Sequence, residues 1–553
     1  MPNSIAQNLT KLANDKTAIQ TALVNKGVTS ASTHGFDDFA TDIASIPTSA
    51  SAEGHKCIIT TIPNANVTLS KTGTTYTQTA NSSGIATFHN VLAGTYTVQA
   101  SITVNDFTAN SDTTTIVVDD HTATEDTFAT ITITAPENCN ITISDGTTTK
   151  TVSYLAGASI VQYANLNTTW DISATISGTL VSRTVSVSAY GNQNVSLQLT
   201  HIYGVSWGFS GNSLTRTGDS ALFSDPVPYV SGMTASQCSS PFDSLMPWSG
   251  MTKSTDENGN VLVAIPKFWY KIEKTNKALT IQIADGEVEG FHVSPAHRAR
   301  SSSDFDRDVV YIGRYHSSSS NWKSVSGASP KTNVTRAAAR TGVHNLGEEY
   351  YQLDISMWTT IWMLYIVEFA NWDSQAKIGY GCGNDSSVQN TGASDSMPYH
   401  TGTMKTSKTT YGVGVQYRNI EDPWGNVLDW CDGITFNNAN IYCFDNFSQY
   451  ADSYSSTGAK LVGTRPTSSN YIKNWGLSSQ SGYEWFMYPS EVQSARTEIP
   501  DYCSYDSSGV VLCVGGSYNQ SANRGLFYLN GNDGASGSYG SIGVRLQRRP
   551  SSN

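Results

Sequence analysis

The most informative stretch of this sequence is CVGGSYNQSANRGLFY, from Cys513 to Tyr528, followed by SIGVRL, from Ser541 to Leu546. Tyr, Asn, Ser, Gly and Asp fill almost all positions between an apolar frame formed by Val514, Leu526, Phe527, Ile542, Val544 and Leu546. Tyr offers a large contact area with only two side-chain torsions to restrict, and Ser, Asn and Gly offer adaptable hydrogen bonding. The stretch therefore predicts a recognition surface rather than a reaction site.

Length and composition indicate a large, β-rich protein. At 553 residues the chain is too long for one core, so several domains are expected. Charged residues make up only 14% and hydrophobic residues 38%, while Gly (45) and Tyr (28) are abundant, which suits β-sheets and long ordered loops. The net charge of −12 argues against a nucleic-acid partner, because such proteins need a basic surface.

The sequence gives no sign of membrane insertion or of secretion. The best candidate for an apolar span, from Ile361 to Ala370, is short and contains Glu368, so we expect it in a buried core. The N-terminus lacks the charged and apolar regions of a secretory signal.

The eight cysteines contain no CxxC pair and form no zinc motif. Their wide spacing favours reduced thiols in a protein made in the cytosol. Two pairs could still form under oxidising conditions: Cys431 with Cys443, and Cys503 with Cys513.

Residues 1–50 are expected to be mostly helical. Over residues 4–25 a heptad seam runs through Ile5, Leu9, Leu12, Ile19 and Leu23, with Lys16 in the skipped place. Gly27 should end this helix, and a shorter one near residues 36–43 should stop at Pro47. Because three heptads are marginal alone, the element is either a hairpin that packs on itself or an oligomerisation and attachment element.

After a linker at residues 48–56, apolar residues alternate with Thr and Ser, which predicts two tandem β-sandwiches at 57–125 and 126–200. Thr61-Ile62-Pro63 corresponds to Thr134-Ala135-Pro136, so the second module repeats the first. Internal repetition favours a spacer over a reaction site. The first module resembles carboxypeptidase-regulatory-like or bacterial immunoglobulin-like modules through NVTL (66–69) and SGIATF (83–88).

Residues 203–553 form the large C-terminal domain, expected to be α+β with long polar loops. The clear helix runs from Met357 to Phe369 and is apolar nearly all round, so it should be buried. Strands are expected at residues 261–265, 309–312 and 510–514.

Three motifs in this domain resemble the C-type lectin fold in its formylglycine-generating-enzyme branch. PWGNVLDWCDG (423–433) is similar to that branch's Gly-Asn-Val-x-Glu-Trp signature. VGGS (514–517) resembles its Gly-Gly-Ser strand, and IGVRL (542–546) resembles its closing Gly-Phe-Arg-Leu strand, with Val544 where Phe is usual. Because their order and spacing fit, the resemblance implies a C-type lectin fold.

Two sub-families with different functions share the fold that this resemblance implies. The enzymatic one oxidises a substrate cysteine with a cysteine pair before the final strand, but no cysteine follows Cys513 here, so we expect no enzyme and no catalytic residue. The other comprises variable proteins of diversity-generating retroelements, including phage receptor-binding proteins, and residues 513–546 match its layout. The resemblance implies that the variable, ligand-binding positions are Tyr518, Asn519, Gln520, Ser521, Asn523, Arg524, Tyr528, Asn530, Asn532, Asp533, Ser538 and Tyr539.

These likenesses imply a receptor-binding protein of a phage tail, made in the host cytoplasm and carried on the virion. Its partner would be a protein or glycan on a bacterial surface. The N-terminal element resembles leaders of tail proteins from phages of Gram-positive bacteria, so it would join other tail or baseplate proteins, and a homotrimer is expected. The alternatives are a formylglycine-generating-enzyme-like oxidase and a bacterial surface adhesin.

Several residues invite a sharper interpretation than the sequence supports. Asn426, Asp429 and Asp432 could ligate calcium, but the Glu-Pro-Asn and Trp-Asn-Asp motifs of calcium lectins are missing. We therefore expect no cofactor, and hydrogen bonds from Asn426 and Asp429 to loop backbones.

Three groups of residues are expected at the surface. His292 and His297 read as surface histidines because a metal site would need further ligands. His344, Glu348 and Glu349 read as a solvated loop. Tyr518, Tyr528 and Tyr539 have polar neighbours, so exposure is expected for them as well.

Overall fold

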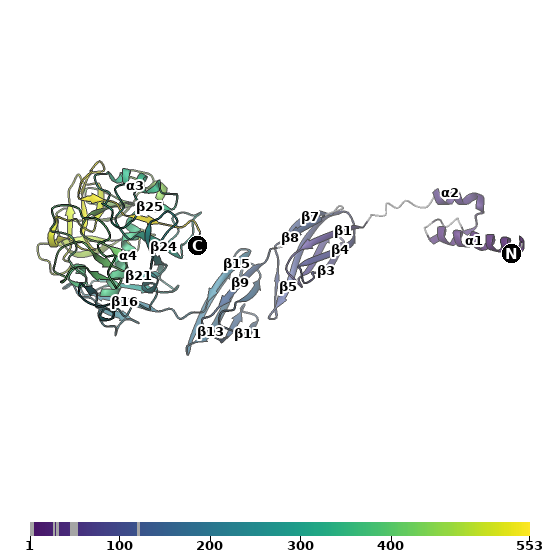
Figure 1. The fold of residues 1–553 in the computed structure, drawn as a ribbon. Helices are drawn as coiled ribbons and strands as arrows, with labels where there is room; N and C mark the ends of the chain where they lie inside the picture. The colour runs from purple at the N-terminus through teal and green to yellow at the C-terminus, as the bar shows by residue number, and fades with distance from the viewer. Residues whose placement is uncertain are drawn as a thin grey trace. The chain divides into compact units, whose positions relative to one another are not determined.

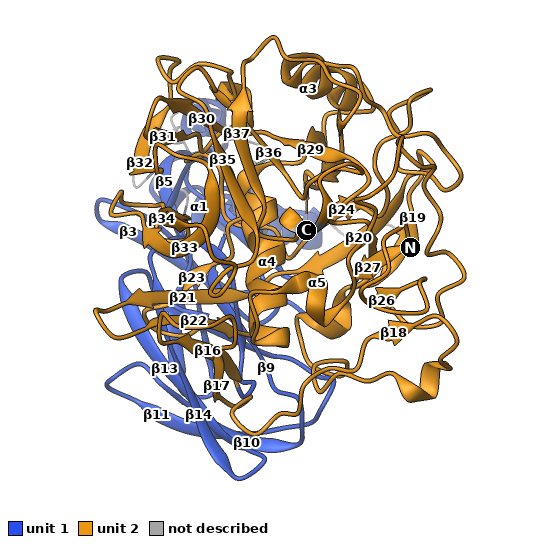
Figure 2. Ribbon diagram, turned by 90° about the vertical axis from the view of Figure 1, so that its left-hand side faces the viewer, with its two compact units in different colours: residues 1–199 blue, residues 200–553 orange. Residues whose placement is uncertain are grey.

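The computed structural model describes residues 5–25, 28, 32–44, 54–118, 122–125 and 127–552. It divides into two compact units, residues 1–199 and 200–553, coloured separately in Figure 2. Most of the regular structure is β-sheet, with short helices at the N-terminus, so the prediction of a β-rich chain of several parts is confirmed at that level. Among the described residues, no helix is both long and apolar enough to cross a bilayer.

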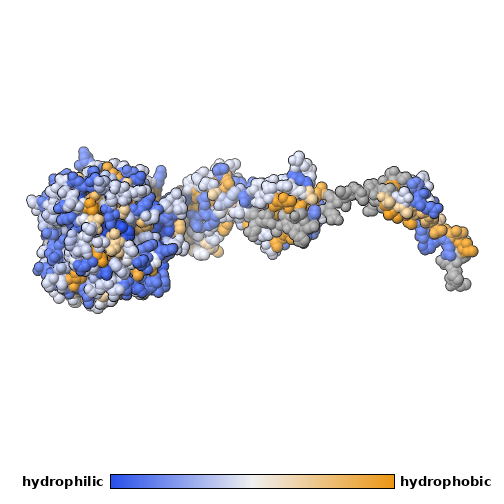
Figure 3. All heavy atoms as spheres, turned by 90° about the horizontal axis from the view of Figure 1, so that it is seen from above, coloured by the Kyte–Doolittle hydropathy of each residue, from blue (hydrophilic) through white to orange (hydrophobic). Residues whose placement is uncertain are grey.

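The N-terminal element consists of α1 (Ile5–Asn25), η2 (Phe36–Asp38) and α2 (Phe39–Ala44); Figure 1 labels α1 and α2. Among its described residues, it packs on itself where Leu23, Val28 and Phe39 form a small core. The other seam positions stay open: Ile5, Leu9, Leu12 and Ile19 are 79%, 61%, 52% and 38% exposed. Figure 3 shows hydrophobic atoms gathered on these helices. Gly27 and Pro47 lie outside the described residues.

The first β-module has two sheets that share one core. One sheet has the order β4 (Ile85–Val91), β1 (His55–Thr60), β8 (Thr122–Glu125); the other has β3 (Thr74–Thr79), β2 (Asn66–Lys71), β5 (Gly94–Val104), β6 (Phe107–Asn110), with β7 (Thr114–Val118) also on β5. Side chains alternate between buried and more open positions along β2 and in the first half of β5. The buried set comes from both sheets, for example Ile59, Phe88, Val67 and Tyr96.

The second β-module repeats this pattern of pairing. One sheet has the order β12 (Ile160–Ala164), β9 (Ala129–Thr134), β15 (Gly191–Ser196); the other has β11 (Thr149–Tyr154), β10 (Cys139–Ser144), β13 (Thr168–Ile176), β14 (Thr179–Val187). β9 pairs antiparallel with β12 and parallel with β15, just as β1 pairs with β4 and β8. Its core centres on Trp170, whose ring lies 4.8 Å from that of Phe107 in the first module.

Three larger sheets frame unit 2. The first has the order β17 (Thr215–Gly218), β16 (Ile202–Trp207), β22 (Leu279–Ala284), β21 (Trp269–Lys274), β23 (His292–Val293). The second has β19 (Lys253–Thr255), β20 (Val261–Pro266), β24 (Val309–Gly313), β39 (Leu546–Arg548), β25 (Tyr350–Gln352). The third has β34 (Met487–Gln493), β33 (Asn470–Leu477), β35 (Tyr502–Tyr505), β37 (Leu529–Asp533), β36 (Val511–Val514), β29 (Leu428–Cys431), β38 (Ile542–Gly543). The strands expected at 261–265, 309–312 and 510–514 are thus β20, β24 and β36.

Smaller elements complete the unit. Two sheets have the orders β18 (Tyr229–Val230), β26 (Gly402–Thr403), β27 (Val415–Tyr417), β28 (Ile420–Glu421) and β30 (Ile434–Asn437), β31 (Asn440–Cys443), β32 (Lys460–Thr464). The short helices are α3 (Arg336–His344), α5 (Ser374–Lys377), η3 (Ala235–Gln237), η4 (Trp248–Gly250), η5 (Phe447–Gln449) and η6 (Ser521–Asn523).

The predicted central helix is present as α4 (Ile355–Phe369), which begins two residues before the expected start and lies in the middle of unit 2 (Figure 2). Asp354 caps it by accepting a hydrogen bond from the Met357 N–H at 2.7 Å. All fifteen residues are buried, and Trp362 and Tyr365 both pack against the ring of Phe527. The helix therefore joins the core to the frame of the C-terminal stretch.

The closing segment is held by Arg545, whose side chain is fully buried. Its Nε lies 3.0 Å from Asp429 Oδ2, and its terminal nitrogens donate to the carbonyls of Gly313, Arg314, Glu421 and Asp422, each at 3.0 Å. The Arg545 side chain therefore links three segments that are distant in the sequence to β38 and β39, the strands that precede and follow it.

We expect Arg545→Ala to destabilise unit 2 by about 3–5 kcal/mol, because it leaves Asp429 buried without its strongest partner. Arg545→Lys keeps the charge but loses the planar fork, so an intermediate loss is expected. Urea unfolding followed by tryptophan fluorescence measures both. The exposed Arg496→Ala is the control and should change stability by well under about 1 kcal/mol; equal midpoints for all three variants would contradict the assigned role.

Candidate functional site

The candidate site is built on a frame that is buried as predicted. Val514, Leu526, Phe527, Ile542, Val544 and Leu546 are each at most 3% exposed, and Trp424 and Trp430 are fully buried. After β36 the chain turns through Gly515 and Gly516, with φ of 85° and 75°, a left-handed conformation that favours glycine. A Cβ on Gly516 would lie 2.2 Å from the Cβ of Arg524. The turn therefore depends on both glycines.

The first loop of the site, residues 517–523, is fastened mainly through its backbone. The Tyr518 N–H donates to Asn426 O at 3.0 Å, and the Ser521 N–H donates to Gly383 O at 2.6 Å. Asn519, Ser521 and Asn523 are exposed, and Tyr518 and Gln520 are partly buried. The exposed side chains are thus free to face a ligand.

The second loop, residues 532–541, presents Asn532, Ser538 and Tyr539, the last 45% exposed. The Asn333 N–H donates to Tyr539 O at 3.0 Å, and the Leu428 N–H donates to Ser541 O at 3.0 Å. Since the first loop is tied to Asn426 and the second to Leu428, their anchors lie only two residues apart along the chain. Nine of the twelve predicted positions therefore fall in residues 517–523 and 532–541, although Asn532 and Asp533 end β37, and Tyr518, Gln520 and Asp533 are partly buried.

Arg524, predicted as a ligand-binding position, is one of three such residues whose side chains the structure buries. Its guanidinium donates to the carbonyls of Tyr380 and Gly381, at 3.0 and 3.1 Å, and lies 5.2 Å from the Tyr411 ring. A Cβ on Gly383 would lie 1.3 Å from Arg524 Nη1. The missing side chain at Gly383 makes the space for this arginine, and burial lowers the pKa of Arg524 to about 10.

Tyr528 and Asn530 are also buried, at 3% and 8% exposure, which corrects the expectation that Tyr528 is exposed. The Tyr528 ring belongs to the core around Trp430, and its hydroxyl accepts a hydrogen bond from Gln520 Nε2 at 2.8 Å. Asn530 lies on β37 and donates to Asp533 Oδ2 at 2.8 Å. The sequence around Tyr528 and Asn530 is polar, but both side chains are buried in the folded protein. They therefore support the loops rather than face a ligand.

Sequence reasoning missed several residues that adjoin the first loop. Residues 384–387 are exposed and lie beside it, since the Asp385 N–H donates to Tyr518 O at 2.9 Å. The Tyr471 hydroxyl donates to Asn523 Oδ1 at 2.7 Å, and Arg496 lies over the Tyr471 ring. Only the antiparallel pairing of Tyr471 with Tyr502 brings this region to the site, and no local pattern in the sequence signals that pairing.

A neutral carboxyl lies beneath the first loop. Asp501 is 1% exposed and accepts a hydrogen bond from the Phe527 N–H at 2.8 Å. Burial raises the pKa of Asp501 to about 8, and the nearby charge of Asp373 adds to the effect. Gly525 passes so close that a Cβ there would lie 2.4 Å from Asp501 Oδ1. The base of the loop is therefore built around a protonated Asp501.

The oxygen cluster around Trp430 is committed to protein partners. Asn426 exchanges two hydrogen bonds with the Gln389 backbone, at 2.9 and 3.0 Å, as expected. Asp429 bonds to side chains instead of backbone, lying 3.0 Å from both His316 Nδ1 and Arg545 Nε, and its interactions with these two side chains lower its pKa although burial acts to raise it. Asp432 is held by Arg340 at 2.6 Å. Among the described residues, no cluster of His, Cys, Asp and Glu could hold a metal ion.

Of the two histidines expected at the surface, one lies there and the other does not. His292 is exposed, but His297 is fully buried, so its assignment to the surface is wrong. Its ring nitrogens lie 2.6 Å from Ser294 Oγ and 2.8 Å from Ile265 O. Burial lowers the pKa of His297 to about 3, so this histidine is a neutral core residue.

All eight cysteines are free thiols in the structure, and the two considered pairs are not joined. Burial raises the pKa of Cys503 to about 12 and raises the pKa values of Cys431, Cys443 and Cys513 well above the usual range. Thiols of this kind stay protonated and are poor nucleophiles.

Comparisons with known proteins give only distant likenesses. No family model matches the sequence, and no curated protein matches it. Among solved structures, Treponema denticola variable protein 1 is similar at 12% identity and a TM-score of 0.22, over 54% of this chain and 99% of that chain. A minor pilin of Streptococcus agalactiae is similar at 10% identity and a TM-score of 0.14, over 26% and 94%. A Ca2+-stabilised, ice-binding adhesin of an Antarctic bacterium is similar at 11% identity and a TM-score of 0.11, over 48% and 90%. TM-scores this low assign neither fold nor function.

Asp501 predicts a pH dependence of stability. Its pKa is raised in the folded state, so the native protein binds this proton more tightly than the unfolded chain. The resulting stability is complete below about pH 4 and is lost as the pH rises through about 8. Between about pH 5 and 9, Asp501→Asn should therefore flatten the fall of the melting temperature with pH. The exposed Asp506→Asn is the control and should keep the wild-type slope; an unchanged slope in Asp501→Asn would refute the assignment.

Proposed function

We propose that the protein is an adhesin that binds a ligand on a bacterial surface through the loops at residues 517–523 and 532–541. The observation that carries the proposal is that the side chains open to a ligand are not the ones that hold this region together. Accessible Asn, Ser and Tyr side chains stand on a buried frame, and the loop backbones are tied to Asn426, Gly383, Asn333 and Leu428 through main-chain atoms. Such side chains suit adaptable recognition.

We further propose a phage tail as the setting, with the protein on the virion, and a C-type lectin fold for unit 2 diversified by a retroelement. The support is the resemblance of residues 423–433, 514–517 and 542–546 to the variable-protein branch. The two β-modules would then serve as immunoglobulin-like spacers and the N-terminal helices as the attachment to other tail or baseplate proteins. A bacterial surface adhesin is the alternative setting, and it would use the same loops.

An oxidase of the formylglycine-generating type fits the chain less well. Its chemistry needs a reactive cysteine pair before the final strand, and no cysteine follows Cys513. The buried cysteines nearest to the site have raised pKa values, which opposes thiolate chemistry. We therefore propose a binding protein without enzymatic activity.

A homotrimer would explain the open seam on α1. Three positions at heptad spacing, Ile5, Leu9 and Leu12, are more than half exposed, and a helix gains most of its stability from packing of such an apolar face. Copies joined in this way would raise avidity without new contacts at the loops.

The seam gives a direct prediction for the oligomeric state of the full-length chain. Leu12→Asp should convert the trimer to monomers in light scattering after size exclusion, because a buried seam position cannot accept a charge. Leu461→Asp is matched in exposure, at 49% against 52%, lies on unit 2 and should leave the trimer intact. A wild-type protein that is monomeric at all concentrations would exclude the trimer.

Binding of the labelled full-length protein to a panel of Gram-positive cells, measured by flow cytometry, tests the function. Tyr539→Ala and Asn519→Ala should each weaken binding to any cell that the wild type binds, with a loss of tenfold or more at a position that contributes over about 1.4 kcal/mol. Tyr454→Ala removes an equally exposed tyrosine (41% against 45%) away from the loops and is the control.

If all of these variants bind as well as the wild type, the recognition surface lies elsewhere. If the wild type binds no envelope fraction, the proposal of an adhesin is rejected.

Natural variants of the gene give an independent test. Substitutions should fall on exposed loop positions and spare the buried Tyr528 and Arg524; a uniform sequence across a population would leave a fixed-specificity adhesin.

A further inference from the structure

A second candidate site lies in a cleft of about 960 Å³ on unit 2. Its walls come from residues 300–307, the C-terminal end of α3, β25, η5 and residues 549–551. None of the twelve predicted ligand residues lines it. The volume is at the upper end of the range for small-molecule sites, so a ligand of several rings or residues would fit.

This cleft changes the interpretation of His344, Glu348 and Glu349, which all line it. His344 and Glu348 are exposed as expected, but His344 ends helix α3 instead of lying in a loop, and the three residues line one cleft. Glu349 is occupied by Arg548 Nε at 2.9 Å and the Ser551 N–H at 2.6 Å. A general acid and base pair is therefore not supported, and binding is the better interpretation.

Aromatic rings cover part of the cleft wall. Tyr351 and Phe447 stack with their centroids 3.9 Å apart, and Tyr450 follows at 5.2 Å from Phe447. Phe305 is 41% exposed and has the Arg307 guanidinium over one face at 3.7 Å. Exposed aromatic rings in a polar cleft are typical of a site that binds a ligand with flat, partly apolar faces.

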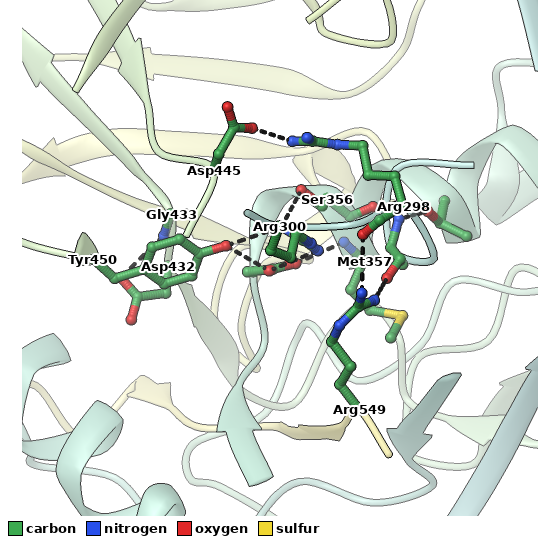
Figure 4. A network of polar contacts seen from close by, with 12 residues as sticks. Arg298, Arg300, Ser356, Met357, Asp432, Gly433, Asp445, Tyr450 and Arg549 are labelled. Carbon is green, nitrogen blue, oxygen red and sulfur yellow. Dashed lines mark hydrogen bonds and ion pairs between the residues drawn. The ribbon is translucent and has the colours of Figure 1, made fainter. Parts of the chain in front are cut away.

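The charges of the cleft are compensated within the protein. Arg300 lies 3.4 Å from Asp354, Arg307 and Arg549 both pair with Asp304 at 2.8 and 2.9 Å, and Arg340 holds Asp432 at 2.6 Å. Figure 4 shows Arg300, Asp432 and Arg549 within this network. An anionic ligand would have to compete with these carboxylates, so the wall favours an uncharged one.

Two polar atoms of the wall have no hydrogen-bond partner. The Gln352 amide nitrogen donates to Trp430 O at 3.1 Å, while its Oε1 accepts nothing; Arg300 Nε likewise donates to nothing. Gln352 is 1% and Arg300 6% exposed, and a buried group of this kind normally has a partner. Both atoms are buried behind the wall, so a ligand hydroxyl reaches them only if these side chains shift.

We propose that this cleft binds a short uncharged saccharide. Its hydroxyls match the polar rim of Ser301, Ser303 and Asn345, and the C–H faces of its rings pack on Phe305 and the edge of Phe447. The site is separate from the loops at residues 517–541 and does not rest on their proposed function.

The test is titration of the full-length protein with maltotriose, cellotriose, chitotriose and mannotriose by calorimetry and saturation-transfer NMR. At least one should bind in the millimolar range or tighter, and added salt should not weaken it, because no ligand charge is involved. Phe305→Ala should lower the affinity tenfold or more, with an unchanged melting temperature.

Tyr454→Ala, equal to Phe305 in exposure at 41% and outside the cleft wall, is the matched control and should bind like wild type. The proposal fails if no trisaccharide binds up to about 10 mM, or if Phe305→Ala binds as well as wild type. It also fails if only oligogalacturonate or an acidic peptide binds and salt abolishes the interaction, since the cleft would then be an anion site.

Discussion

Unit 2 depends on one buried guanidinium. Arg545 stands between β38, which belongs to the seven-stranded sheet, and β39, which belongs to the five-stranded sheet. Taking a charge out of water costs free energy unless every donor is satisfied, and here four carbonyls and Asp429 provide the partners. Because those partners come from the ends of β24, β28 and β29, the two sheets can meet only in the register that satisfies Arg545.

That register positions the two loops without using their outward side chains. The anchors at Asn426 and Leu428 flank the start of β29, the strand whose Asp429 binds Arg545. Since the anchoring bonds join main-chain atoms, any residue can occupy the exposed positions at little cost to stability, as surface substitutions usually show. The same arrangement explains how a rigid core can support a face whose chemistry is polar and adaptable.

Sequence patterns predicted the parts of this arrangement that depend on local periodicity. The apolar run at 357–369 is α4, the alternating runs are strands, and the six frame residues are buried. Burial of Arg524 and Tyr528 could not be predicted in this way. Gly383, far away in the sequence, makes the space for Arg524, and the pairing of β36 and β37 turns Tyr528 inward. The cleft could not be predicted either, because five separate segments form its wall.

The buried members of the predicted set limit how far the face can vary. Gln520 donates to the Tyr528 hydroxyl, and its Oε1 accepts from the Ser517 N–H at 2.8 Å, so these side chains hold the shape of the first loop. Exchanging them would leave unsatisfied buried groups, which cost about 1–3 kcal/mol each. By contrast Asn519, Ser521, Asn532 and Tyr539 point away from the frame. Diversity in this protein is therefore compatible with stability only at the rim of the loops, and the adjoining residues 384–387 and Tyr471 extend that rim with side chains that the sequence motif does not include.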